Sequence, residues 1–224
     1  MEKRWIKLLV LAVFMTPTEA FYTIEETRGL GVPDTILTKD PQGVLVRDDY
    51  GAYKHLAMSQ QSCWVHLLRT SRDMESKEAK KLHQELKRIF KQLNKIIKSD
   101  FNEESRQSKY EQYSKRIQKI INRKYLKKDT LKVQTRIRNQ NTNLITALLY
   151  SDVPLTNNPA EQQIRPLTVQ RKISGGSRSD NGAETLTVNM SIIQTLKLRG
   201  KELSSGLQEL LMTRKHKFSV EKLT

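Results

Sequence analysis

Residues 43–53 are GVLVRDDYGAY, in which a glycine precedes a short apolar run and two aspartates follow it. The run Val44-Leu45-Val46 predicts a buried strand that ends near Arg47. A carboxylate at the carboxyl end of such a strand, here Asp48, lies where open α/β sheets commonly place functional groups. Two aspartates followed by Tyr-Gly also favour a simple turn. Both interpretations of Asp48 stay open at this point.

The segment before this strand predicts a β-hairpin. It consists of an apolar strand over residues 6–15, a Thr-Pro-Thr turn and a second strand over residues 20–27. Residues 1–20 also imitate a secretory signal, with a basic start, an apolar stretch over residues 8–15 and a small-residue end. The hairpin is favoured, because that stretch is short for a signal and the residues after it have the pattern of strand pairing. A short helix is expected over residues 33–37.

The segment after the strand is predicted to become helical. Residues 57–64 favour another short strand, and a helix opens over residues 65–69. Residues 77–98 predict an amphipathic helix with one apolar stripe and lysines opposite. A second helix extends to about Lys127, and a third is marked by apolar residues from Val133 to Leu148.

The charge of the chain is concentrated in this helical middle. The chain has 40 basic and 24 acidic residues, and residues 70–140 alone contain 21 basic and 9 acidic ones. A basic outer surface indicates a polyanionic partner and excludes an acidic solvating tail. One cysteine excludes a disulfide-stapled scaffold, and no apolar run approaches the roughly 18 residues that span a bilayer.

The sequence after Pro154 predicts a helix start followed by a cationic loop. Asn158 can cap the helix, Pro159 fits its first position, and Glu161 suits a capping box, four residues before Arg165. The helix is expected to be short because Pro166 interrupts it. Residues 171–178, RKISGGSR, offer donors suited to phosphates. Two more helices, at residues 183–196 and 204–213, close the chain.

Cys63 and His66 form half of a possible metal site. A Cys-x-x-His pair has suitable spacing for zinc, but no second half is visible in the sequence. We therefore expect Cys63 and Trp64 to belong to the core.

These segments together resemble a known family. The strings GVLVRDDYGAY, CWVHLLR, LTNNPAEQQIRPLTVQRKISGGSRS and NGAETLTVNMSIIQTLKLRG closely resemble bacterial transposases of the insertion sequence 66 family. The resemblance extends from about Phe21 to Leu211.

The resemblance implies a ribonuclease H-like core in which two Asp and one Glu bind two divalent metal ions. Asp48 matches the second carboxylate and Glu161 the third, with Mg²⁺ as the ion and Mn²⁺ able to replace it. In this interpretation His66 lines the active site. The resemblance places four side chains on DNA phosphates: Arg165, Arg171, Lys172 and Arg178.

The sequence departs from the family pattern at its start. The first catalytic Asp belongs on a strand upstream of the hairpin, and Asp34 and Asp40 come too late to replace it. We therefore expect the carboxyl-terminal part of a transposase that binds transposon ends and target DNA but does not cut DNA alone. An upstream transposase fragment or a second copy is the expected partner.

The predicted fold class is α/β, with a ribonuclease H-like core incomplete at its N-terminus, a large helical insert and C-terminal helices. The expected parts are core strands at 1–69, the basic insert at 70–150, the Glu161 helix with the basic loop at 151–178, and helices at 179–224. The expected location is cytoplasmic and nucleoid-associated, without a membrane. Two alternatives remain: a DNA-binding remnant without catalysis, and a secreted cationic helical protein.

Overall fold

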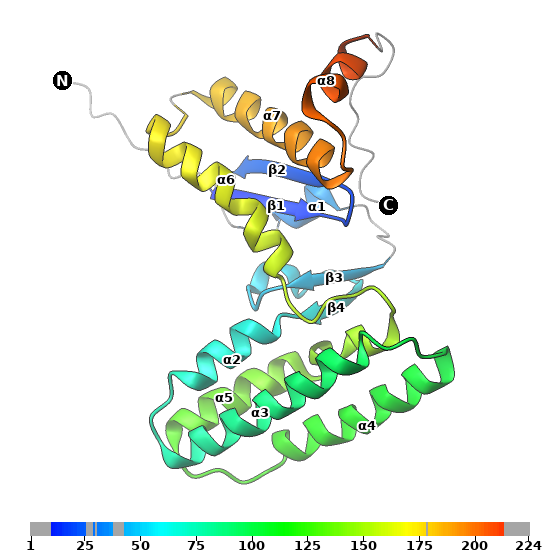
Figure 1. Ribbon diagram of the computed structural model, residues 1–224. Helices are drawn as coiled ribbons and strands as arrows, with labels where there is room; N and C mark the ends of the chain where they lie inside the picture. Colours follow the sequence, from blue (N-terminus) through cyan, green and yellow to red (C-terminus); the bar gives the residue numbers. More distant parts are fainter. Residues whose placement is uncertain (1–9, 26–28, 30, 38–42, 178, 213–224) are drawn as a thin grey trace, which may run out of the picture. The chain divides into compact units, whose positions relative to one another are not determined.

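A computed structural model describes residues 10–25, 29, 31–37, 43–177 and 179–212 of the chain (Figure 1). The chain forms two compact units, each mixing helices with a two-stranded sheet. The helical unit is Gln42–Asn157, and the hairpin unit combines Met1–Pro41 with Asn158–Thr224. The described structure is thus mixed α/β and mainly helical, as predicted. The functional division expected at residues 69, 150 and 178 stays a prediction.

The helical unit begins with two parallel strands. β3 (Val44–Arg47) pairs with β4 (Ser59–Ser62), with Val44 opposite Ser59 and Arg47 opposite Ser62. A 3₁₀ turn, η1 (Gly51–Tyr53), lies between them. Both strand predictions are confirmed, and Asp48 directly follows β3.

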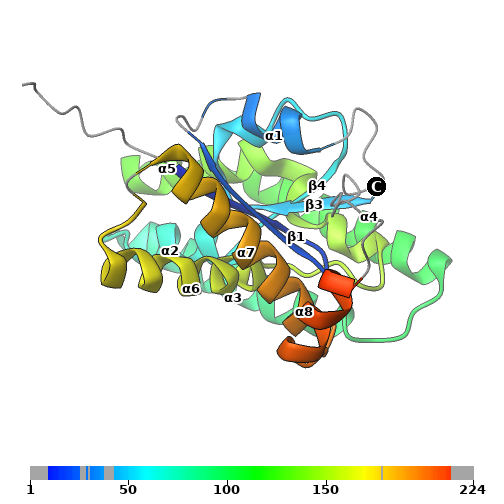
Figure 2. The ribbon, with the colours of Figure 1, turned by 90° about the horizontal axis from the view of Figure 1, so that it is seen from above.

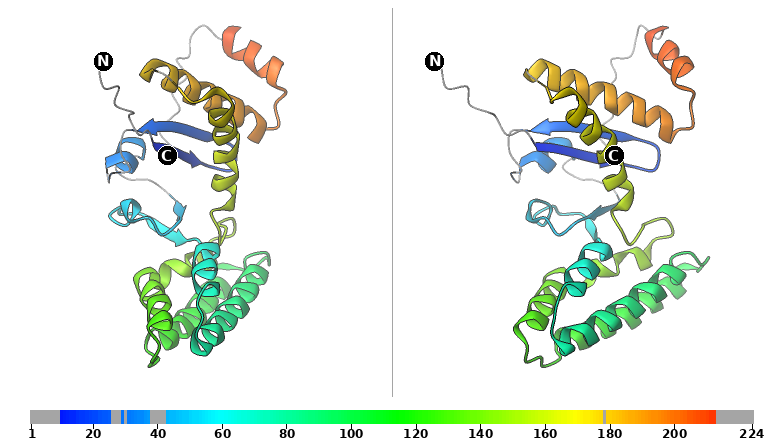
Figure 3. Two further views of the ribbon diagram at one scale, coloured as in Figure 1. Left: turned by 90° about the vertical axis from the view of Figure 1, so that its left-hand side faces the viewer. Right: turned by 60° about the vertical axis from the view of Figure 1, so that its left-hand side comes forward.

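Four helices complete this unit: α2 (Trp64–Arg72), α3 (Lys77–Ile96), α4 (Glu103–Ile121) and α5 (Lys128–Gln140). α2 packs on α3 and α5, and α5 also contacts α4, as the two views of Figure 3 show. The apolar stripe predicted for residues 77–98 is confirmed, because its leucines and Ile89 are buried. This stripe packs on Trp64 and Leu67 of α2 in one hydrophobic core.

The predicted third helix is shorter than its apolar pattern suggested. α5 ends at Gln140, and two 3₁₀ turns follow, η2 (Asn141–Leu144) and η3 (Thr146–Leu149). Asn141 has a φ of 42°, outside the right-handed helical region, so the α-helix cannot continue through it. The second predicted helix likewise ends at Ile121 rather than near Lys127.

Asp129 ties the start of α5 to the start of α3. Its Oδ2 accepts the Ser76 backbone N–H at 2.8 Å, and its Oδ1 accepts the Ser76 hydroxyl at 2.8 Å. The Ser76 hydroxyl oxygen in turn accepts the N–H of Ala79 and caps α3. These donors stabilise the charged carboxylate and lower the pKa of Asp129 to about 2.

We expect Asp129→Asn to destabilise the protein at neutral pH and to matter progressively less in acid. The carboxyl has a lower pKa folded than unfolded, so its stabilisation is complete above the unfolded value of 3.8 and is lost as pH falls towards about 2. Urea unfolding followed by circular dichroism from pH 6 to pH 2 measures this. A difference between variant and parent that stays constant with pH would contradict the ionic role of Asp129.

The hairpin unit contains the predicted antiparallel pair. β1 (Val10–Met15) and β2 (Ala20–Glu25) pair with Met15 opposite Ala20, so the turn is confirmed at residues 16–19. The signal-like stretch therefore supplies β1 from Val10 onwards. A short helix, α1 (Gly31–Ile36), follows as expected.

Three C-terminal helices complete the hairpin unit: α6 (Asn158–Ser174), α7 (Asp180–Leu198) and α8 (Leu203–Met212). α7 packs along β2 and α6 contacts β1, and Figure 2 shows α7 beside the hairpin. A small apolar core joins Ala20 and Tyr22 of β2 to Leu167 and Met190. No helix within the described ranges is both long and apolar enough to cross a membrane.

The prediction that Pro166 ends its helix is wrong. α6 is 17 residues long with Pro166 inside it, although proline lacks the N–H that an interior helical position donates. Tertiary contacts hold both sides of the proline: the Tyr22 hydroxyl donates to the Gln163 carbonyl at 2.7 Å, and Leu167 is buried against the hairpin. Burial raises the pKa of Tyr22 to about 12, which keeps this hydroxyl a donor.

Candidate functional site

Asp48 lies at the carboxyl end of β3, where the sequence predicted a functional carboxylate. Its side chain is half-buried, and Oδ1 accepts the backbone N–H of Tyr50 at 3.0 Å. This bond is an Asx turn, so the simpler interpretation of the motif is correct as local geometry. A carboxylate has about four acceptor sites, and one such bond leaves Asp48 able to bind a cation as well.

Asp49 has a different role from its neighbour. Its Oδ2 forms an ion pair with Arg136 Nε of α5 at 3.0 Å, and both side chains are largely buried. The same guanidinium donates from Nη1 to the Thr70 hydroxyl of α2 at 2.6 Å. Asp49 therefore joins the end of β3 to two helices, which distinguishes it from Asp48.

A buried arginine supports this end of the strand. Arg47 is only 3% exposed and donates from Nε to the Gln60 side chain at 2.6 Å and from Nη1 to the Asp48 carbonyl at 2.7 Å. Burial lowers the pKa of Arg47, and the charges of Asp49 and Asp48 partly oppose that effect. The guanidinium thus brings a positive charge beside both aspartates.

Sequence reasoning did not identify Arg47 and Arg136 as part of this arrangement. The sequence did contain a signal for Arg47, because this residue directly continues three apolar strand residues. An arginine buried at the end of such a strand needs polar or charged partners. No local signal existed for Arg136, since it lies 87 positions after Asp49.

Cys63 and Trp64 belong to the core, as expected. Both are buried where β4 passes into α2, and the Cys63 Sγ accepts the backbone N–H of Asn157 at 3.3 Å. His66 is half-buried on the first turn of α2. A role for His66 beside the active site stays a prediction.

Glu161 lies in the first turn of α6 and is half-buried. Because α6 continues past Pro166, positions 4 and 11 residues further on share its face, and these are Arg165 and Lys172. Both cations are exposed, while Leu167 packs on the hairpin from another side of the helix. One face of α6 thus carries a carboxylate followed by two cations. The sequence already placed Arg165 one turn after Glu161, but it missed Lys172 because it ended the helix at Pro166.

The cationic loop predicted for residues 171–178 is only partly a loop. Arg171 and Lys172 lie in the last turn of α6, and both are exposed. The loop begins at Gly175 and Gly176, whose φ values of 71° and 87° end the helix in the left-handed region. Arg178 lies outside the described residues.

Asp48 belongs to the helical unit and Glu161 to the hairpin unit. Their convergence on one cation pocket therefore stays a prediction.

Comparison with known proteins identifies the family. No curated protein and no solved structure matches the chain. The family model described as Transposase IS66 family matches residues 2–185, which is most of the chain and includes Asp48, Glu161 and the whole of α6. The chain therefore belongs to the IS66 family of transposases.

Proposed function

We propose that this chain supplies part of the DNA strand-cleaving and strand-joining machinery of an IS66-family transposase. Asp48 and Glu161 are, in this proposal, two carboxylate ligands of a site for two Mg²⁺ ions. The observation that carries it is the family match across both residues. The half-buried position of Asp48 after a parallel strand supports it, because Asp49 forms an ion pair, whereas Asp48 forms none with the residues that the structure describes.

The donor set fits a hard divalent cation. Mg²⁺ prefers carboxylate oxygens and keeps several waters, so few protein ligands suffice. When bound, two such ions activate the attacking oxygen and stabilise the leaving oxygen of an in-line phosphoryl displacement.

The residues of this chain have separate tasks in the proposal. Asp48 is held in place by the Asx turn to Tyr50, and the Arg47 guanidinium anchors its backbone carbonyl. Arg165 and Lys172 follow Glu161 on one face of α6 and bind DNA phosphates beside it, and Arg171 and Arg178 also bind DNA phosphates in this proposal. The basic helical unit contributes electrostatic affinity that is steeply dependent on salt.

We also infer a ribonuclease H-like core. An antiparallel hairpin, a parallel strand with a carboxylate at its end, and a helix that carries the last carboxylate occur in the order that the family resemblance implies. In this inference α3 to α5 are an insert between the second and third carboxylates.

Metal binding tests the assignment directly. Titration of the full chain with Mn²⁺, followed by electron paramagnetic resonance, is expected to show a site that Asp48→Asn and Glu161→Gln each weaken at least about tenfold. Each substitution removes an anionic ligand while it preserves side-chain size.

Asp152→Asn and Asp49→Asn serve as controls, the first in an exposed acid and the second in the adjacent one. Both should retain Mn²⁺ affinity. Loss of binding in Asp49→Asn but not Asp48→Asn would move the assignment by one residue. If only one of the two proposed ligands matters, the shared site is wrong. DNA binding without any Mn²⁺ affinity favours the DNA-binding remnant.

A further inference from the structure

The outer face of α4 presents cations that the proposed metal site does not use. Two shallow hollows of about 610 and 750 Å³ open along this helix and share Lys115, Lys119 and Arg123. Arg116 lines the larger one. We call the surface defined by these four cations the α4 groove. It lies entirely within the helical unit.

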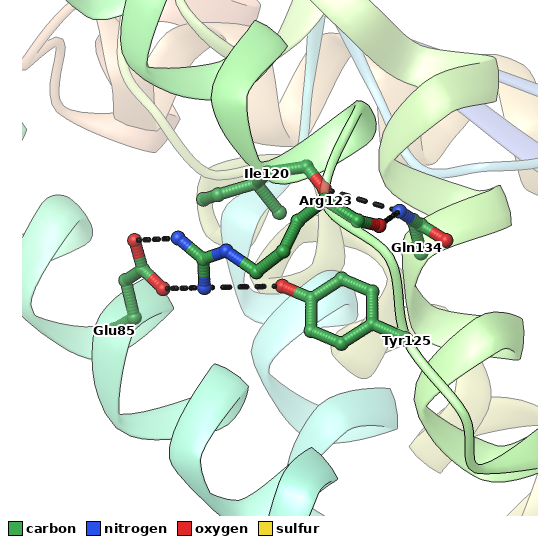
Figure 4. A network of polar contacts seen from close by, with 5 residues as sticks. All are labelled: Glu85, Ile120, Arg123, Tyr125 and Gln134. Carbon is green, nitrogen blue, oxygen red and sulfur yellow. Dashed lines mark hydrogen bonds and ion pairs between the residues drawn. The ribbon is translucent and has the colours of Figure 1, made fainter.

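Arg123 is held in one orientation by its neighbours, as Figure 4 shows. Its Nη1 donates to Glu85 Oε2 of α3 at 2.8 Å and to the Tyr125 hydroxyl at 3.3 Å, and Nη2 donates to Glu85 Oε1 at 3.3 Å. The buried Gln134 amide donates to the carbonyls of Ile120 and Arg123, which fixes the end of α4. The backbone that carries Arg123 is therefore anchored to α5, and its side chain to α3.

Arg116 is oriented in a similar way, but by uncharged partners. Its Nη1 donates to the Gln92 side chain of α3 at 2.6 Å, and its guanidinium lies 5.9 Å from the Tyr113 ring centroid. Both partners are neutral, whereas Glu85 neutralises Arg123. Among the described residues Arg116 forms no ion pair, and its guanidinium is already oriented by Gln92 and Tyr113, so less side-chain entropy is lost when an anion binds.

The lining of the groove indicates what it binds. Lys115 and Lys119 are exposed one helical turn apart, and the four cations exceed the two acids of the lining, Glu85 and Glu111. Every residue that lines the two hollows is polar or charged, so no apolar side chain lines them to anchor an acidic peptide. A chain of regularly spaced anions fits this lining better.

The cations also form a row, which suits a linear polyanion. Lys115 and Lys119 lie one turn apart on α4, and Arg123 lies just past the end of that helix at Ile121. We propose that the α4 groove binds the phosphate backbone of DNA. This proposal rests on the proposed function, and it makes the α4 groove the part of the helical insert that contacts DNA.

Neutralising two lysines of the groove tests the proposal against a matched control. The test variant is Lys115→Gln with Lys119→Gln. The control is Lys80→Gln with Lys87→Gln, which removes the same charge from exposed positions on α3 that lie away from Glu85 and Gln92. Anisotropy of a fluorescein-labelled DNA duplex, titrated with the full chain at several NaCl concentrations, gives the affinity and its salt slope.

We expect the slope of log K against log salt to become less steep by about 2 in the groove variant. Each lost phosphate contact releases about one counterion fewer on binding. The control should keep the parent slope. Equal losses in both variants would show diffuse attraction and overturn the proposal. Poly-glutamate that competes as well as unlabelled DNA at equal charge would overturn the choice of partner. If the parent chain binds no DNA, the proposed function fails as well, whereas DNA binding that ignores the groove lysines rejects this inference alone.

Discussion

Trp64→Ala should lower the free energy of unfolding of the helical unit by about 3–5 kcal/mol, the usual cost of a large cavity in a packed core. Trp64 is fully buried and stacks on Phe90 with ring centroids 5.8 Å apart. Its Nε1 donates to the Leu144 carbonyl at 2.6 Å, so the ring also joins α2 to η2. The midpoint of urea denaturation, followed by circular dichroism, measures the loss.

Two further variants separate packing from hydrogen bonding at this site. Trp64→Phe keeps most of the apolar contact, and the Leu144 carbonyl still accepts the Gln61 amide at 3.2 Å, so its cost should be less than half that of Trp64→Ala. Leu126→Ala, at a position that is 75% exposed, should change stability by no more than about 0.5 kcal/mol. A similar cost for Leu126→Ala and Trp64→Ala would contradict the described core.

Combined replacement of two hydroxyl residues of α7 should strongly destabilise the hairpin unit. The Ser191 hydroxyl oxygen accepts the backbone N–H of Tyr22 at 2.9 Å, and the Thr195 hydroxyl oxygen accepts that of Ala20 at 3.1 Å. Both bonds are buried. Ser191→Ala with Thr195→Val leaves two buried N–H groups without acceptors, at about 1–3 kcal/mol each.

Hydrogen exchange monitored by NMR reports on this directly. The amides of Ala20 and Tyr22 should lose protection from exchange in the double variant, because their hydrogen bonds to α7 are gone and this edge of β2 opens more often. Thr185→Val is the matched control, because Thr185 is exposed on the same helix and bonds only to the Asn181 carbonyl within the described residues. Protection that survives in the double variant would mean that α7 does not hold this strand edge.

The α7 hydroxyls illustrate what local sequence patterns cannot reveal. Apolar residues of this helix, among them Ala183, Met190 and Leu196, are buried. Ser191 and Thr195 looked like ordinary polar positions, yet they are buried too. An outer strand leaves N–H groups unpaired, and which helix covers that edge depends on residues about 170 positions away.

The candidate site likewise combines features that local sequence patterns suggest with features that depend on distant residues. The family resemblance selected Asp48 and Glu161, and that selection stays a prediction. Spacing alone left Asp48 open between a functional carboxylate and a turn residue, and it suited Glu161 to a capping box. The distinction between Asp48 and Asp49 was not local, since it depends on Arg136 of α5. The place of Lys172 on the face of Glu161 and Arg165 was likewise hidden, because the packing of Tyr22 and Leu167 carries α6 through Pro166.

The sequence by itself determined the helices of the insert, the strands on either side of them and the excess of positive charge, because hydrophobic periodicity and composition act over a few neighbouring residues. Tertiary structure decided where helices stop or continue, which acids are committed to ion pairs and which arginines of the α4 groove are held in place. Those outcomes depend on contacts between residues far apart in the chain, and a single-sequence pattern contains no information about which distant residues meet.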